Sequence, residues 1–108
     1  METMFADAVL AAKSAGASVL LVHEPSWSSV GSADTGTPQS KVDDAIETVA
    51  RQHGVRALDP RAAFSARRDE FLFLDDSHLT PRGKLLLAGL IAEAIAEWFE
   101  ARQPVAAP

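Results

Sequence analysis

The chain has 108 residues, 47% of them hydrophobic, and a formal net charge of -5 at pH 7. This length and apolar content predict one small folded domain or a part of a larger one, and exclude a largely disordered chain. The acidic balance argues against a nucleic-acid partner, which would require clustered Lys and Arg, and the absence of cysteine excludes disulfides and thiolate chemistry.

The first part of the sequence predicts a helix, a strand and a long loop. Apolar residues at helical spacing indicate a helix over Met4–Ser14, and Gly16 is a natural stop. The short apolar run Ala17–His23 is typical of a strand that is buried on both faces of a parallel sheet. Glu24–Gln39 is rich in Pro, Gly, Ser and Thr, and predicts a loop at the carboxyl end of this strand, where open α/β sheets bind ligands.

A second helix and a second strand follow. Ser40 is the expected N-cap of the helix, Asp43 and Asp44 are favourable charges in its first turn, and Gly54 ends it. Val55–Leu58 is the second short strand. The same pattern of a helix followed by a short apolar run therefore occurs twice.

The most regular element is the final helix. Glu70–Leu74 is an apolar stretch that should anchor the loop behind it to the core. Thr80 as N-cap and Pro81 at the first helical position then predict a long helix. We expect the folded domain to span residues 1–102, followed by a disordered tail at 103–108.

The order helix, strand, helix, strand, helix predicts an α/β fold with a crossover between parallel strands. Two buried strands are too few for a stable sheet, because each expects neighbours on both sides. We therefore expect that an N-terminal portion is missing, or that a second chain covers the exposed strand edge. No signal peptide or transmembrane segment is visible, so the compartment is unassigned, with a cytoplasmic location as the default for a complete chain.

Asp75 and His78 are the strongest candidates for catalytic chemistry. An Asp three residues before a His on a loop can reach the imidazole, fix its tautomer and stabilise its protonated form. This is what the base half of a nucleophilic triad requires. Asp76 competes for the same contact, and the plainer alternative is an Asp that caps a turn beside a solvent-facing His.

The segment from Asp75 to Gly83, Asp-Asp-Ser-His-Leu-Thr-Pro-Arg-Gly, resembles the last conserved block of the SGNH/GDSL hydrolases, a family of serine esterases and lipases. The resemblance implies a flavodoxin-like, three-layer α/β/α sandwich with a five-stranded parallel sheet, of which this chain is a part. It implies that Asp75 is the triad carboxylate and His78 the general base. It also implies an acyl or acetyl ester as substrate, in a small molecule, carbohydrate or lipid, and neither a metal nor an organic cofactor.

The Gly-Asp-Ser segment that carries the nucleophile in this family is absent from the sequence. We therefore expect the chain to supply the His/Asp half of a triad and to be inactive by itself. The serines of the long loop lack the strand-to-helix elbow and adjacent glycine that a substitute nucleophile would need; they are Ser26, Ser28, Ser29 and Ser32. Acyl transfer on the same triad would differ from hydrolysis only in the acceptor.

His23 and Trp27 are weaker candidates, for substrate contacts. His23 lies at the presumed rim of the active site, but a strand-end His bonded to the backbone is the favoured interpretation. Trp27 either lines a substrate pocket or pins its loop to the surface. A metal site made of His23, Glu24, Asp75 and His78 is disfavoured, because nothing in their spacing sets two His on one face.

The alternative function is a non-catalytic binding or assembly module that has a hydrolase-like fold. Its exposed strand edge and the long Ser- and Gly-rich loop would form the interaction surface, with self-association through the edge. A stable dimer that buries the edge would favour this alternative over an esterase.

Overall fold

The structure is a computed structural model that describes the backbone of residues 2–31 and 38–102 and the side chains of residues 2–30 and 41–100. In chain order its elements are α1 (Glu2–Ser14), β1 (Leu20–Val22), α2 (Trp27–Gly31), α3 (Pro38–His53), β2 (Arg56–Leu58), α4 (Arg61–Ala66), the 3-10 turn η1 (Arg68–Glu70) and α5 (Pro81–Arg102). The predicted tail at 103–108 lies outside the described residues. No helix within the described ranges is both long and apolar enough to cross a membrane.

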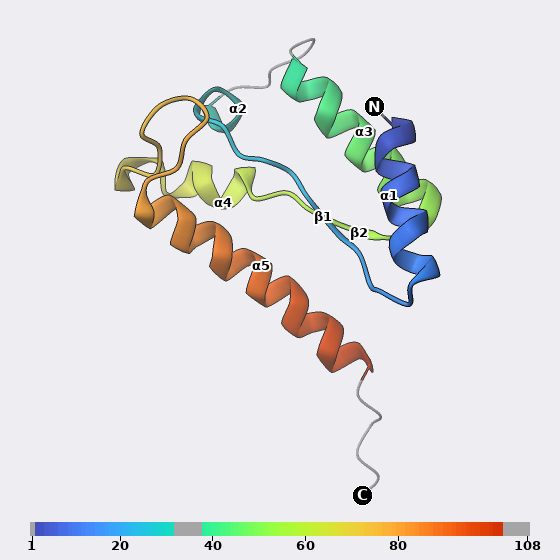
Figure 1. The fold of residues 1–108 in the computed structure, drawn as a ribbon. Helices are drawn as coiled ribbons and strands as arrows, with labels where there is room; N and C mark the ends of the chain where they lie inside the picture. Colours follow the sequence, from blue (N-terminus) through green and yellow to red (C-terminus); the bar gives the residue numbers. More distant parts are fainter. Residues whose placement is uncertain (1, 32–37, 103–108) are drawn as a thin grey trace, which may run out of the picture.

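The two strands pair in parallel, with Leu20 opposite Arg56 and Val22 opposite Leu58. α1 and α3 pack together on one side of the strands, and α5 runs along the other side (Figure 1). The predicted mixed α/β class with parallel strands is therefore confirmed. The expectation of strands buried on both faces is wrong: β1 and β2 are half-buried, because within the described residues each has only the other as a neighbour.

The predicted loop Glu24–Gln39 is wrong in part, because it contains α2 and the first residues of α3. The serines that suggested a loop also begin a helix. The Ser26 hydroxyl accepts the backbone N–H of Ser29, while the Ser29 hydroxyl accepts that of Ser26. Two backbone donors are thus satisfied reciprocally, as in a capping box. The predicted N-cap at Ser40 is wrong, because α3 begins at Pro38 and Ser40 lies within the helix.

One cluster of buried hydrophobic residues lies beneath the loop that carries Asp75 and His78. Val30, Phe64, Leu72 and Phe73 form its buried cluster, and leucines of the loop and of α5 pack against them. The stretch Glu70–Leu74 anchors the loop through only two of its four apolar residues, since Phe71 and Leu74 are exposed.

The N-terminus of α5 confirms the predicted cap. The Thr80 hydroxyl accepts the backbone N–H of Gly83 at 3.1 Å, and Pro81 occupies the first helical position. Gly83 itself is required by close packing. A Cβ atom at this position would lie 2.3 Å from the carbonyl oxygen of Leu72, nearer than side chains can approach.

We predict opposite effects on stability for two glycine substitutions in α5. Gly83→Ala should lower the free energy of unfolding by about 2 kcal/mol, because the backbone of Leu72 must move. Gly89→Ala is the matched control, since nothing lies within 4 Å of the position that its new methyl group would occupy. It should raise stability by about 0.5 to 1 kcal/mol through helix propensity. Urea unfolding followed by circular dichroism measures both, and equal effects would contradict the tight contact at Gly83.

Candidate functional site

Three hydrogen bonds close the loop that connects η1 to α5. The backbone N–H of Leu74 donates to the His78 carbonyl at 2.7 Å, and the N–H of Thr80 donates to the Leu72 carbonyl at 2.9 Å. The Thr80 hydroxyl donates to the carbonyl of Phe71 at 2.8 Å. The loop is therefore fixed at its base, directly above the core.

Within this loop Asp75 holds the ring of His78. The His78 Nδ1 atom lies 2.8 Å from one carboxylate oxygen of Asp75 and 3.0 Å from the other. The same carboxylate accepts the backbone N–H groups of Ser77 and His78, at 3.0 and 2.9 Å. Asp75 thus caps the turn and orients the imidazole at once. The ring of His78, followed by the N–H of Ser77, lowers the pKa of the Asp75 carboxyl, so the group is anionic at neutral pH.

The other ring nitrogen of His78 faces outward. The His78 side chain is 73% exposed, and within the described part of the chain Nε2 has no hydrogen-bond partner. In a nucleophilic triad the carboxylate binds Nδ1 and the nucleophile approaches Nε2. The geometry therefore satisfies two of the conditions for a general base: a fixed tautomer and a ring nitrogen open to a reactant.

Asp76 has a different task from its neighbour. Its carboxylate accepts the backbone N–H of Ser28 at 2.8 Å, and its carbonyl accepts that of Trp27 at 2.9 Å. Asp76 therefore ties the loop to the start of α2. Of the two acids that the sequence left in competition, the structure places Asp75 against the imidazole.

A cavity of about 370 Å³ opens beside His78, at the carboxyl end of β1. The side chains that line it come from the end of β1, from the loop and from α5; they include Val22, His23, Pro25, His78, Lys84 and Leu87. Because ligands of α/β sheets bind beyond the carboxyl ends of the strands, this cavity is a candidate ligand site.

His23 lines the same cavity but is fully buried and engaged on both sides. Its Nδ1 atom lies 2.7 Å from a carboxylate oxygen of Asp43, and its Nε2 atom lies 2.6 Å from one of Glu47. This arrangement leaves no ring nitrogen for a substrate. The interpretation that favoured a backbone partner is wrong about the partner, because both contacts are to acidic side chains of α3.

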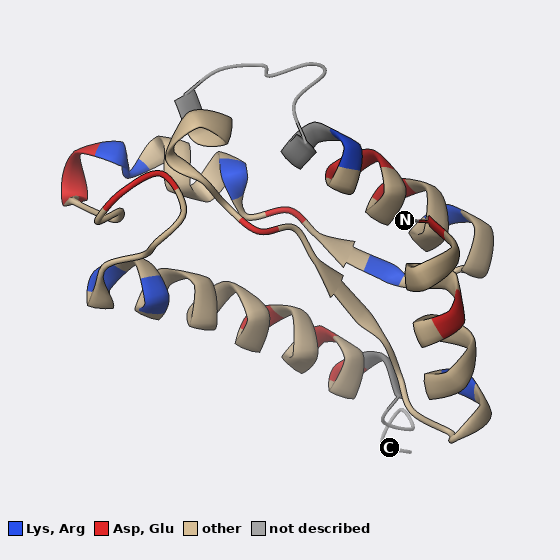
Figure 2. Cartoon of the chain, turned by 45° about the horizontal axis from the view of Figure 1, so that its top comes forward, with Lys and Arg blue, Asp and Glu red and all other residues tan. Residues whose placement is uncertain are grey.

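A chain of charges continues from His23. Arg61 lies 3.0 Å from the second oxygen of Asp43 and also binds Asp59, whose carboxyl pKa the guanidinium lowers. Figure 2 shows acidic residues directly after both strands and along α3, where this network lies. Asp43 is therefore a buried structural residue, where the sequence suggested only a favourable charge in the first turn of the helix.

Sequence reasoning missed this network, although one signal was present. Asp43 and Glu47 are four residues apart in a predicted helix, so they share one face of it. A His at the end of the preceding strand is a natural partner for such a pair. The spacing alone does not say that the helix face turns towards the strand.

Two of the loop serines are committed elsewhere, since Ser26 and Ser29 form the cap of α2. The Ser28 hydroxyl lies 3.5 Å from that of Ser26, and Ser32 lies outside the described residues. The Ser77 hydroxyl lies 3.3 Å from His78, but at Nδ1, the nitrogen that Asp75 already holds. Trp27 is half-exposed and lines a second pocket on the other side of the loop.

The two histidines of the disfavoured metal site are committed to different partners. In the described ranges, no group of three or more His, Asp or Glu is placed to hold a metal ion. His23 is committed to Asp43 and Glu47, whereas His78 contacts Asp75. The two histidines thus belong to separate clusters.

We predict that the turn around Asp75 depends on its ionised carboxylate. The folded protein holds the pKa of Asp75 below its ordinary value of 3.8. The contacts should thus be fully present above pH 3.8 and be lost as the pH falls through the depressed value. NMR spectroscopy should show the Ser77 amide shifting with a midpoint below 3.8, and Asp75→Asn should abolish that transition. Asp76→Asn is the control, and should instead perturb the Ser28 amide.

We predict that the two histidines of the cavity differ sharply in their effect on stability. His23→Ala should lower the free energy of unfolding by about 3 kcal/mol, because it leaves the buried carboxylate of Asp43 without one of its partners. His78→Ala should leave the unfolding midpoint nearly unchanged, since the side chain is largely exposed. Thermal and urea unfolding compare them, and a large loss for His78→Ala would mean that this residue is structural.

Comparisons of the chain with protein-family models, with curated proteins and with solved structures find no match. The site is therefore interpreted on its own geometry and on the resemblance of the segment from Asp75 to Gly83.

Proposed function

We propose that this chain supplies the His78–Asp75 half of an SGNH/GDSL-type serine ester hydrolase that acts on acyl or acetyl esters. The observation that carries the proposal is the pair of contacts from the Asp75 carboxylate to His78 Nδ1, at 2.8 and 3.0 Å, beside an outward-facing Nε2. The sequence that follows, Leu-Thr-Pro-Arg-Gly, adds support. Thr80 bonds the carbonyl of Phe71, and Gly83 allows α5 to pack closely against the backbone of Leu72.

The proposed mechanism has two steps. A serine hydroxyl from a Gly-Asp-Ser segment, which this sequence lacks, attacks the ester carbonyl while His78 Nε2 takes its proton. His78 then gives the proton to the leaving alcohol, and Asp75 stabilises the imidazolium between the two transfers. In the second step water attacks the acyl-serine, with His78 again moving the proton.

We also propose that the chain forms part of a three-layer α/β/α sandwich. Helices on both sides of a two-stranded parallel sheet support it, as do the half-buried strands, which have room for further neighbours. The cavity at the end of β1 lies next to the strand that would gain such a neighbour. A nucleophile carried at the carboxyl end of an added parallel strand would enter this cavity beside His78.

The test begins with the codons that precede Met1. An in-frame Gly-Asp-Ser segment would be expressed together with this chain and assayed on p-nitrophenyl esters. In that protein His78→Ala should lower kcat by at least about 10⁴-fold, and Asp75→Asn by about 10²- to 10⁴-fold. Asp76→Asn is the matched control and should cost less than about tenfold, because Asp76 contacts α2 and not the imidazole.

Full activity after His78→Ala would overturn the assignment. A stop codon directly before Met1, with no such segment, would also remove the catalytic proposal. The assembly module would then lead, supported by the strand edge of β1, and its expected outcome is a dimer in sedimentation analysis that dissociates when a proline is placed in β1.

A further inference from the structure

We propose that two copies of this chain associate through a groove that α5 forms with α4 and η1, with the α5 helices of the two copies antiparallel. The groove has a volume of about 520 Å³, and we call it the helix groove. The residues that α5 contributes to it are Arg82, Leu85, Leu86, Gly89, Leu90 and Glu93. The cavity beside His78 is lined by two other residues of α5, Lys84 and Leu87. The proposed interface and the candidate catalytic pair therefore use different faces of the helix.

Four residues of the helix groove form a single row along α5. They are Arg82, Leu86, Gly89 and Glu93. Their intervals of four, three and four residues place them above one another on the helix. Along the chain the row has a positive charge, a leucine, a glycine and a negative charge, and in the opposite direction both the two charges and the two middle residues exchange places. The row is thus complementary to a second copy of itself in the antiparallel direction.

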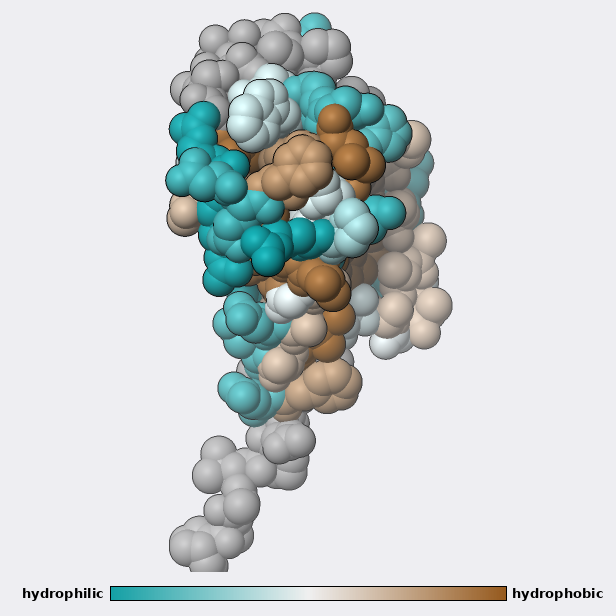
Figure 3. All heavy atoms as spheres, turned by 90° about the vertical axis from the view of Figure 1, so that its left-hand side faces the viewer, coloured by the Kyte–Doolittle hydropathy of each residue, from teal (hydrophilic) through white to brown (hydrophobic). Residues whose placement is uncertain are grey.

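An antiparallel pair in this register gives every residue of the row a partner. Arg82 of each copy meets the partner's Glu93, and Leu86 meets the partner's Gly89. Beside the row, Leu85 is 74% exposed in the single chain and meets the partner's Leu90. Each contact occurs twice, because a twofold axis relates the two copies. Figure 3 faces the end of the molecule where η1 and the start of α5 lie, and shows hydrophobic side chains exposed beside hydrophilic ones there.

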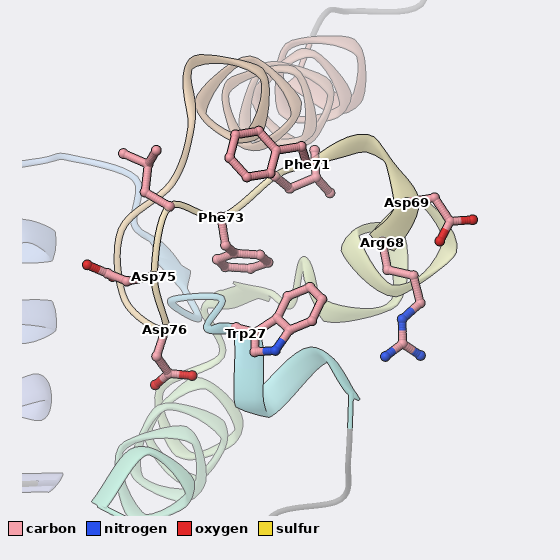
Figure 4. A pocket seen from close by; sticks show the side chains of 9 residues that line it. Trp27, Arg68, Asp69, Phe71, Phe73, Asp75 and Asp76 are labelled. Carbon is pink, nitrogen blue, oxygen red and sulfur yellow. The ribbon is translucent and has the colours of Figure 1, made fainter.

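The charges of the helix groove favour a second copy over a ligand with a single charge. At one end Arg67 and Arg82 share the carboxylate of Glu70, at 3.9 and 3.4 Å, which leaves an excess of positive charge. Arg68, between them in the sequence, lines a different pocket (Figure 4). Glu93 lies about three helical turns from Arg82. A ligand with one charge would satisfy one end only, whereas an antiparallel second copy satisfies both.

Gly89 leaves room for the second helix. A Cβ atom added at this position would meet nothing within 4 Å, so no contact of the described residues requires a glycine. A glycine in the middle of a helix costs about 1 kcal/mol relative to alanine. The opposite wall of the groove also carries small side chains, Ala63 and Ala66 of α4. In the dimer this space receives the partner's Leu86, which gives the glycine a use that the single chain does not.

Reversal of the two charges tests the register. Sedimentation equilibrium of the 108-residue chain should show a dimer that weakens as salt is added. Arg82→Glu and Glu93→Arg should each weaken it at least about tenfold, because like charges then face each other at both ends. An equimolar mixture of the two variants should associate again, since every glutamate then meets an arginine. Lys84→Glu is the matched control, because it reverses a charge on the other face of α5, and it should leave the dimer unchanged.

Gly89→Leu tests the space between the helices. It should weaken the dimer at least about tenfold, because its side chain fills the space that the partner's Leu86 needs. Circular dichroism should show the same fold as in the parent, since nothing in the single chain lies within 4 Å of the new Cβ atom.

Several outcomes would overturn the proposed dimer. They are a chain that stays monomeric, a mixture of the charge variants that fails to associate, and equal weakening by Lys84→Glu. A dimer that both charge reversals leave intact, but that a proline in β1 dissociates, would place the interface at the strand edge instead. The dimer uses neither Asp75 nor His78, so its failure and the failure of the hydrolase proposal are separate results.

Discussion

The structure of the candidate site depends on the position of Thr80. Its backbone N–H and its hydroxyl bind the carbonyls of Leu72 and Phe71, and the same hydroxyl caps α5 by accepting the N–H of Gly83. One residue thus closes the loop, starts the helix and fixes the left-handed backbone of Phe71, a conformation that costs about 1 to 2 kcal/mol in a non-glycine residue. Without these bonds the two ends of the loop that carries Asp75 and His78 would not be held together.

The two histidines of the cavity illustrate how surroundings decide the use of the same side chain. Both ring nitrogens of His23 are engaged, one by Asp43 and the other by Glu47. His23 therefore links the end of β1 to α3 and leaves no ring nitrogen for a reactant. His78 has one carboxylate on Nδ1 and solvent around Nε2, which is the arrangement that a general base requires. Burial and the number of partners, not distance from the cavity, separate the two roles.

Local patterns predicted the parts of the structure that local forces determine. The Thr80–Pro81 start of α5, the parallel α/β class and the Asp75–His78 spacing were all visible, because each depends on neighbours within a few residues. The start of α2 was hidden because serine favours both loops and helix caps. The network around His23 was missed because His23 and Asp43 are 20 positions apart in the sequence. Packing, and not the local sequence, determines which face of α3 turns towards His23. That Leu72 and Phe73 are buried while Phe71 and Leu74 are exposed likewise follows from the fold and not from hydrophobicity.

The Asp75–His78 pair and the sheet depend on different parts of the protein. Asp75, His78 and the bonds that fix them all lie between residues 71 and 83, so the imidazole is oriented without help from distant elements. The sheet needs neighbours that the described residues do not provide, since β1 and β2 remain half-buried. An added strand would lie next to the cavity that His78 lines. Under the proposed function, folding of this chain would prepare the proton-transfer half of the site, and docking of the nucleophile would determine whether the site is active.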